Sequence, residues 1–235
     1  MPSRWSLRLT RLQNRRLCHR LAAAIALGVA SVAFVPGCQV VGIIGAMAQS
    51  AEELGSTVYP AEYDGLDERS YAVIISADRV IESDNPGITA RLTQIIDRDL
   101  RANTLASAHI PAGRLLSKLY ADPSWQALPR GELAEKLGVE RLVVVELVEY
   151  RLHEPGNRYT WDGVASGVVE VYESESGLPD DPMFERTIAV AFPDRTGLLE
   201  EEIPREVITS ELSRRFGERV SWLFYDHEEA NAITY

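Results

Sequence analysis

Carboxylate side chains are the residues of this chain whose spacing most resembles that of a catalytic site. They recur in short clusters, at Asp97 and Asp99, at Asp180-Asp181, at Glu200-Glu201-Glu202, and at Asp226 with Glu228-Glu229. Paired carboxylates hydrolyse glycosides only when they face each other across a cleft, which neighbours in sequence do not. We therefore expect these clusters to be solvated surface. A hydrolase would need a deep pocket with acids from different elements, for which Glu146 and Glu170 on adjacent expected strands are the best pair.

Other chemical motifs do not complete a site. Ser166 lies one residue too late for a G-x-S-x-G nucleophile elbow, and Ser117 is adjacent to Lys118 instead of three residues before it. The chain has no zincin, phosphate-loop, dinucleotide or calcium-loop spacing. The histidines after the first 38 residues are far apart, at His109, His153 and His227. We expect no enzymatic activity, no metal site and no cofactor.

Cysteine chemistry is the exception, and it concerns the N-terminus. Six arginines and no acid occupy residues 1–37, and residues 21–34 form an apolar run that is short for a membrane span of roughly 20 residues. Val35 and Gly37 then precede Cys38. This arrangement resembles the lipobox of bacterial lipoproteins. The resemblance implies cleavage between Gly37 and Cys38, acylation of the Cys38 thiol and of the new N-terminus, and attachment to the lipid bilayer through these chains.

Two other interpretations of the N-terminus stay open. An uncleaved anchor would run from residue 21 to residue 48, although Pro36 and Gln39 interrupt it. A twin-arginine signal would use Arg15 and Arg16, although the residues that follow match it poorly. The arginines stay cytoplasmic in each case, so the rest of the chain lies on the non-cytoplasmic side. Gln39 resembles the residue of outer-membrane lipoproteins in enteric bacteria, which predicts an outer-membrane anchor facing the periplasm.

The remaining chain is strongly acidic. Removing six arginines leaves 24 − 6 = 18 basic against 35 acidic residues, a formal charge of 18 − 35 = −17 for residues 38–235. Such a surface repels phosphate backbones, so we expect no nucleic-acid partner. It also repels anionic lipid headgroups, so membrane attachment requires the acyl chains. Only Cys38 remains as a thiol, which excludes a disulfide or a second cysteine site.

Periodic patterns divide the chain into a signal peptide (1–37), a lipidated N-terminus and tether (38–69), one domain (70–230) and a short tail (231–235). Residues 71–76 form a β-branched strand pattern, and Asn85 and Pro86 indicate the start of a helix. Apolar residues then recur on one face of this helix from Ile88 to Leu100. A short strand is expected at 106–110, and helices at 112–120 and from Pro129, the latter ending at Gly138.

The second half of the domain is expected to be mainly strands. Residues 140–153, 161–173 and 186–192 are strand patterns with short connections, which predicts an antiparallel meander. In the second of these, Ala165, Gly167, Val169 and Val171 are expected on one face. A long helix from Pro204 follows, with Val207 or Ile208 starting its apolar stripe. The order β-α-β-α-α-β-β-β-α predicts an α/β sandwich, with a mixed sheet of about five strands flanked by helices.

The step from helix through Leu137 and Gly138 to a valine-rich strand, within residues 133–145, resembles a periplasmic α/β family. Its members include the curli-secretion lipoprotein CsgG, lipoprotein activators of penicillin-binding proteins and the N-terminal domain of TolB. The resemblance covers about residues 70–225 and implies an envelope protein that docks onto another envelope protein or a cell-wall assembly. It assigns no individual binding residue.

Aromatic residues beside polar ones are the candidate docking residues. Tyr159, Trp161 and Tyr172 are expected around the turn between two long strands, and Trp222 and Tyr225 near the end of the last helix. The alternative is that these rings close the rim of the core. A non-enzymatic adaptor, assembly factor or regulator is therefore the first functional hypothesis. The others are a ligand- or cation-binding protein using the acidic loops 177–182 and 198–202, and the hydrolase described above.

Overall fold

The computed structural model describes residues 56–230. The expected cleavage site at Gly37, the lipidation site Cys38 and the tail 231–235 lie outside these residues. Within the described part, no helix is long and apolar enough to cross a membrane. The compact unit begins at Ser56, earlier than the domain start expected at residue 70.

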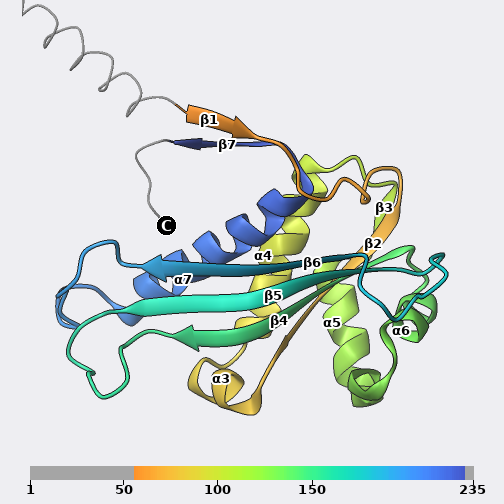
Figure 1. The fold of residues 1–235 in the computed structure, drawn as a ribbon. Coiled ribbons are helices and arrows are strands. Elements are labelled where there is room, and N and C mark those ends of the chain that lie inside the picture. Colours follow the sequence, from red (N-terminus) through yellow and green to blue (C-terminus); the bar gives the residue numbers. More distant parts are fainter. Residues whose placement is uncertain (1–55, 231–235) are drawn as a thin grey trace, which may run out of the picture. The chain divides into compact units, whose positions relative to one another are not determined.

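A mixed five-stranded sheet organises the domain, with the strand order β3-β2-β4-β5-β6 (Figure 1). Parallel pairs join β2 (Ser70–Ala77) to β3 (Ala108–His109) and to β4 (Arg141–Arg151). Antiparallel pairs then join β4 to β5 (Gly163–Glu173) and β5 to β6 (Phe184–Phe192). The predicted fold class and meander are confirmed. The expected strand at 106–110 is reduced to the two residues of β3.

Helices pack on both faces of this sheet. Helices α4 (Ile88–Asn103) and α7 (Arg205–Ser221) cover one face, where the larger core cluster lies. Helices α5 (Ala112–Ala121) and α6 (Arg130–Leu137) cover the other face over β2 and the start of β4, around a smaller cluster. Short helical turns complete the fold, namely α3 (Arg79–Asp84), η1 (Pro123–Ala127) and η2 (Trp222–Phe224).

The periodic patterns agree with the observed burial, with one correction at a helix start. The side chains of Ile88, Leu92, Ile96 and Leu100 are buried as one stripe of α4. Asn85 does not cap this helix. The cap is Gly87, whose left-handed backbone (φ 77°) starts the helix without a side-chain hydrogen bond. Asn85 ends α3 instead, and its buried amide donates to the Tyr150 carbonyl.

The sheet is covered unevenly. Along β5, Ala165, Val169 and Val171 are fully buried under α4 and α7, whereas Val164 and Val168 on the opposite face are only partly buried. On that face Val148 of β4 is 60% exposed. The half of the sheet formed by the end of β4, β5 and β6 therefore has one uncovered face.

Residues 56–69, which the sequence predicts to be a tether, pack against the domain. The strand β1 (Ser56–Tyr59) pairs antiparallel with β7 (His227–Ala230) in a separate two-stranded ribbon (Figure 1). Residues 60–69, which we call the strap, follow β1 and lead into β2. The Leu66 side chain on the strap is completely buried in the larger core cluster. The strap is therefore part of the folded domain.

Candidate docking groove beside the edge strand

A cavity of the described part lies along β6, the last strand of the sheet. It has a volume of about 870 Å³. Residues of β6, the strap, η2, α7 and the β1–β7 ribbon line it, namely Tyr59, Pro60, Glu62, Glu185, Arg186, Thr187, Ile188, Ala189, Arg219, Trp222, Leu223, His227 and Glu229. The side chain of Arg186 forms an ion pair with Glu62 at 3.2 Å and so ties β6 to the strap. The groove is thus open along an edge strand and closed by segments from both ends of the domain.

Stacked rings form the wall opposite β6. The rings of Trp222 and His227 are 4.6 Å apart and nearly parallel at 7°. Tyr59 stacks on His227 at 5.8 Å, and the guanidinium of Arg219 lies 5.5 Å from the Trp222 ring. Arg219 also forms an ion pair with Glu229. Aromatic rings packed together with a cation are an amphipathic combination of the kind found in protein interfaces.

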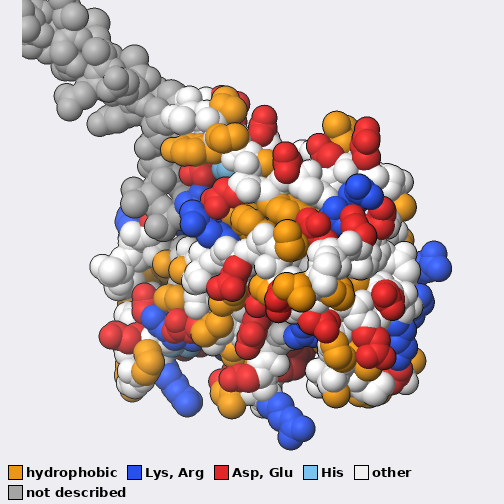
Figure 2. All heavy atoms as spheres, turned by 45° about the vertical axis from the view of Figure 1, so that its right-hand side comes forward, with side chains coloured by type: hydrophobic (Ala, Val, Ile, Leu, Met, Phe, Trp, Pro, Cys, Tyr) orange, Lys and Arg blue, Asp and Glu red, His pale blue; other side chains and the backbone are white. Residues whose placement is uncertain are grey.

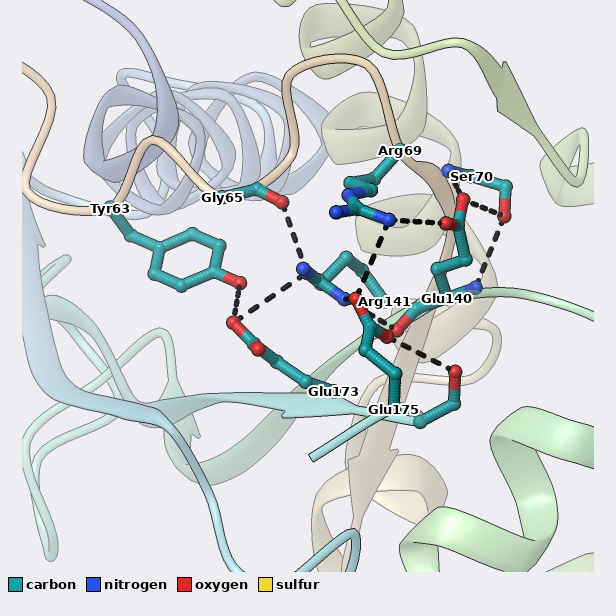
Figure 3. A network of polar contacts seen from close by, with 9 residues as sticks. Tyr63, Gly65, Arg69, Ser70, Glu140, Arg141, Glu173 and Glu175 are labelled. Carbon is teal, nitrogen blue, oxygen red and sulfur yellow. Dashed lines mark hydrogen bonds and ion pairs between the residues drawn. The ribbon is translucent and has the colours of Figure 1, made fainter. Parts of the chain in front are cut away.

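A polar network holds the strap that forms the other wall (Figure 3). Arg141 opens β4, and only 7% of its side chain is exposed. Its guanidinium donates to the Gly65 carbonyl at 3.0 Å and to Glu175 at 2.6 Å. The Tyr63 hydroxyl donates to Glu173 at 2.8 Å, and burial with this carboxylate raises the pKa of Tyr63. Moving the strap away would leave the buried Arg141 guanidinium without the Gly65 acceptor, and burying an unpaired charge is costly. Arg141 therefore fixes the strap to the sheet.

Glu140 makes a second connection beside Arg141. Its carboxylate accepts from the Ser70 backbone N–H at 2.9 Å, from the Ser70 hydroxyl at 3.0 Å and from Arg69 at 2.8 Å. These donors, the backbone N–H first, lower the pKa of Glu140 to about 2. The end of the strap is therefore fixed at the start of both β2 and β4. Because the strap is held in this way, the groove wall formed by Tyr59, Pro60 and Glu62 is pre-formed.

The aromatic residues expected at an interface fall into two groups. Trp161 is 2% and Tyr172 6% exposed, so both close the core, which is the alternative that the sequence left open. They also lie near opposite ends of β5, so the expected cluster around one turn does not form. Tyr159 is 81% exposed, whereas Tyr225 is half-buried beside the ribbon. Trp222 is the one of the five that lines the groove.

The acidic candidates do not gather into a site in the described residues. Glu146 lies opposite Val168, so it is a diagonal neighbour of Glu170 on the uncovered sheet face. Neither carboxylate lines any of the four cavities described for residues 56–230. In the loops, Asp180 accepts from the Gly131 backbone N–H, and Glu202 from the Leu199 backbone N–H. No three His, Cys, Asp or Glu side chains of this part converge as a metal site requires.

The sequence offered little indication of the groove or of the Arg141 network. A charged residue at the first position of a strand patterned for burial on both faces was the one available signal for Arg141. Tyr63 and Leu66 lie in a polar segment without periodicity, so their burial depends on contacts distant in sequence. Acidic side chains spread over the face shown in Figure 2, with hydrophobic side chains exposed between them.

Comparison with known proteins gives structural similarity alone. No family model matches the chain, and no curated protein matches it. A variant PelC dodecamer from Paraburkholderia phytofirmans is 16% identical, with a TM-score of 0.45 over 73% of this chain and 99% of that chain. Lipoprotein GNA1162 from Neisseria meningitidis is 9% identical (TM-score 0.41, 64% and 96% covered). Protein XCC0632 from Xanthomonas campestris is 11% identical (TM-score 0.41, 71% and 87% covered).

Proposed function

We propose that this protein is a lipid-anchored lipoprotein of the bacterial envelope, and that its domain is a non-enzymatic adaptor, assembly factor or regulator of an envelope complex. The observation that carries the proposal is the pre-formed groove beside β6, an edge strand whose outer side pairs with no other strand of residues 56–230. Its walls combine aromatic rings with ion pairs, and the Arg141 network holds one of them in place. Pre-formed surfaces bind partner proteins at a lower cost in conformational entropy.

The anchor part of the proposal depends on Cys38. Two or more acyl chains at this residue give stable attachment, whereas the acidic domain gains nothing from anionic headgroups. The chain would then reach the domain through β1 and the strap, which also form groove walls. The domain lies on the non-cytoplasmic side, and an outer-membrane anchor facing the periplasm is the location that Gln39 favours.

The anchor is tested by labelling cells with a palmitate analogue and fractionating their membranes. We expect the wild-type protein and Cys18→Ala to incorporate label and to sediment with membranes. Cys38→Ala should lose the label and accumulate at a higher mass because the signal stays attached. Label retained by Cys38→Ala would rule out acylation at this residue.

The docking part is tested in living cells with a photoreactive amino acid at single surface positions. Thr187 belongs to the stretch of β6 that borders the groove and has its side chain on the adjoining uncovered face, and Val207 of α7 is an exposed control away from both. We expect one discrete crosslinked envelope protein from position 187 and none from position 207. The same product from both positions, or none from position 187 with the protein folded and abundant, would contradict docking at the groove.

A further inference from the structure

The two edges of the five-stranded sheet differ in a way that concerns the groove. At one edge β3 has two residues, and short edge strands are a common protection against unwanted pairing. At the other edge β6 has nine residues and pairs with β5 in one unbroken register from Phe184 to Phe192. This length exceeds the usual five or six residues, and no bulge interrupts it. The β6 edge is therefore long, regular and suited to pairing with a further strand.

The usual devices that protect an edge are weak on β6. Its sequence, FERTIAVAF, contains no lysine and no proline. The Arg186 side chain is occupied by Glu62 of the strap. Among the described residues no strand pairs with the outer edge, although the Ala191 carbonyl accepts from Arg215 at 3.1 Å. The middle of the strand, at residues 185–189, is the part that opens into the groove.

The side chains around this edge specify what an added strand would carry. Alternate side chains of a strand point to opposite faces. On the groove side, an added strand would meet the apolar or aromatic side chains of Ile188, Leu223 and Trp222. The charged side chains on this side, Arg186 with Glu62 and Arg219 with Glu229, are paired with each other. On the uncovered face it would meet Glu185, Thr187 and Ala189, which are exposed.

The charges on the uncovered face indicate which charged side chain an added strand would carry. Glu185 lies directly opposite Glu170 in the β5–β6 register, and like charges in this position destabilise a sheet. Glu170 accepts a hydrogen bond from the Tyr172 hydroxyl at 3.0 Å. Within residues 56–230 Glu185 has no ion pair. A lysine or arginine beside Glu185 would relieve this repulsion and complement the acidic domain.

From these features we propose that β6 accepts an extended segment of a partner protein as a further antiparallel or parallel strand. The segment would carry apolar side chains toward the groove and a basic side chain beside Glu185. Main-chain hydrogen bonds would provide much of the affinity, and the alternating side chains the specificity. This inference rests on the proposed docking function and states the chemistry of its partner.

The probe for this inference is a nine-residue peptide in which valine and lysine alternate, acetylated, amidated and labelled with a dye on a flexible extension. Its dissociation constant for the mature lipidated protein in detergent is measured by fluorescence anisotropy. We expect binding that Glu185→Lys weakens about tenfold. Glu135→Lys on the exposed side of α6 makes the same change in net charge and should alter binding by less than about twofold. Equal weakening by both substitutions would reduce the effect to non-specific attraction and overturn the proposal.

Backbone methylation tests the pairing itself. Two versions of the peptide are methylated on alternate backbone nitrogens. One version carries the methyl groups on the nitrogens of its valines, and the other on the nitrogens of its lysines. An added strand directs only one set of N–H groups toward β6, so one version should lose binding and the other should keep it. If both versions bind like the parent peptide, strand addition is wrong.

A second copy of the protein is the competing occupant, and native mass spectrometry of the same sample decides between them. We expect a monomer that binds one peptide. The protein could instead form a dimer that the peptide does not dissociate but that Thr187→Arg breaks. This result would overturn the proposal and show that the β6 edge pairs with a second copy of the protein. A discrete crosslink from position 187 in cells, without peptide binding, would sink strand addition and leave the docking function standing.

Discussion

At the scale of single residues, Arg141 is the side chain on which the shape of the groove wall most depends. Its buried guanidinium is paired with Glu175 and the Gly65 carbonyl, and lies 3.6 Å from Glu173. Arg141→Met should leave these groups without their donor and lower the free energy of unfolding by about 3 kcal/mol. The measurement is urea denaturation of residues 39–235. Arg214→Met, which breaks two ion pairs on the exposed face of α7, is the control and should cost less than about 1 kcal/mol. Equal losses would show that Arg141 is no more than a surface pair.

Glu140 predicts how this connection responds to acid. Its folded pKa of about 2 lies below the ordinary value of 4.5, so the carboxylate stabilises the fold at pH values above about 4.5. That contribution is lost as the pH falls from about 4.5 through 2. Glu140→Gln should be less stable than wild type at pH 7, and the difference should shrink as the pH approaches 2. Glu135→Gln on the exposed side of α6 is the comparison. Thermal unfolding at a series of pH values measures the effect, and a difference independent of pH would contradict it.

At the scale of elements, the strap predicts where the folded domain begins. A chain that starts at residue 70 lacks Leu66, whose burial is complete, and the contacts of Tyr63 with Glu173. Losing a buried leucine costs about 3 kcal/mol, so this chain should unfold at a much lower urea concentration than one starting at residue 56. A chain starting at residue 60 keeps the strap and loses only β1. Its free energy of unfolding should be lower by only about 1 kcal/mol, because a two-stranded ribbon contributes little stability. Equal stability of all three chains would mean that the strap is a mere tether.

Elements with a strong period could be predicted, and elements that depend on distant contacts could not. The stripe from Ile88 to Leu100 and the alternation of β5 follow from periods of 3.6 and 2 residues, and both gave the correct buried face. Asn85 has the residue type of a helix cap, but the buried Tyr150 carbonyl engages its amide instead. Of the residues that line the groove, Trp222 was predicted from the sequence, because it is an aromatic residue beside polar ones. The groove was not, because it joins residues 59–62 with residues 185–189 and 219–229, and spacing in the sequence does not show such proximity.

At the scale of the whole molecule, the acidic surface sets a limit on the stability of the domain. A formal charge of −17 on residues 38–235 repels itself, and Figure 2 shows acidic side chains spread over a broad face. Raising the salt from 0.01 to 0.15 M shortens the Debye length from about 30 to about 8 Å, which should increase the free energy of unfolding by on the order of 1 kcal/mol. The double variant Glu135→Lys/Glu206→Lys changes the charge by four, to −17 + 4 = −13. Added salt should therefore increase its free energy of unfolding by less than that of the wild type. Both substitutions lie on exposed helix positions outside the groove. Thermal unfolding in sodium chloride makes the comparison. A melting temperature that falls with salt would mean that ion pairs such as Arg141 with Glu175 and Arg215 with Asp194 outweigh the repulsion between acids.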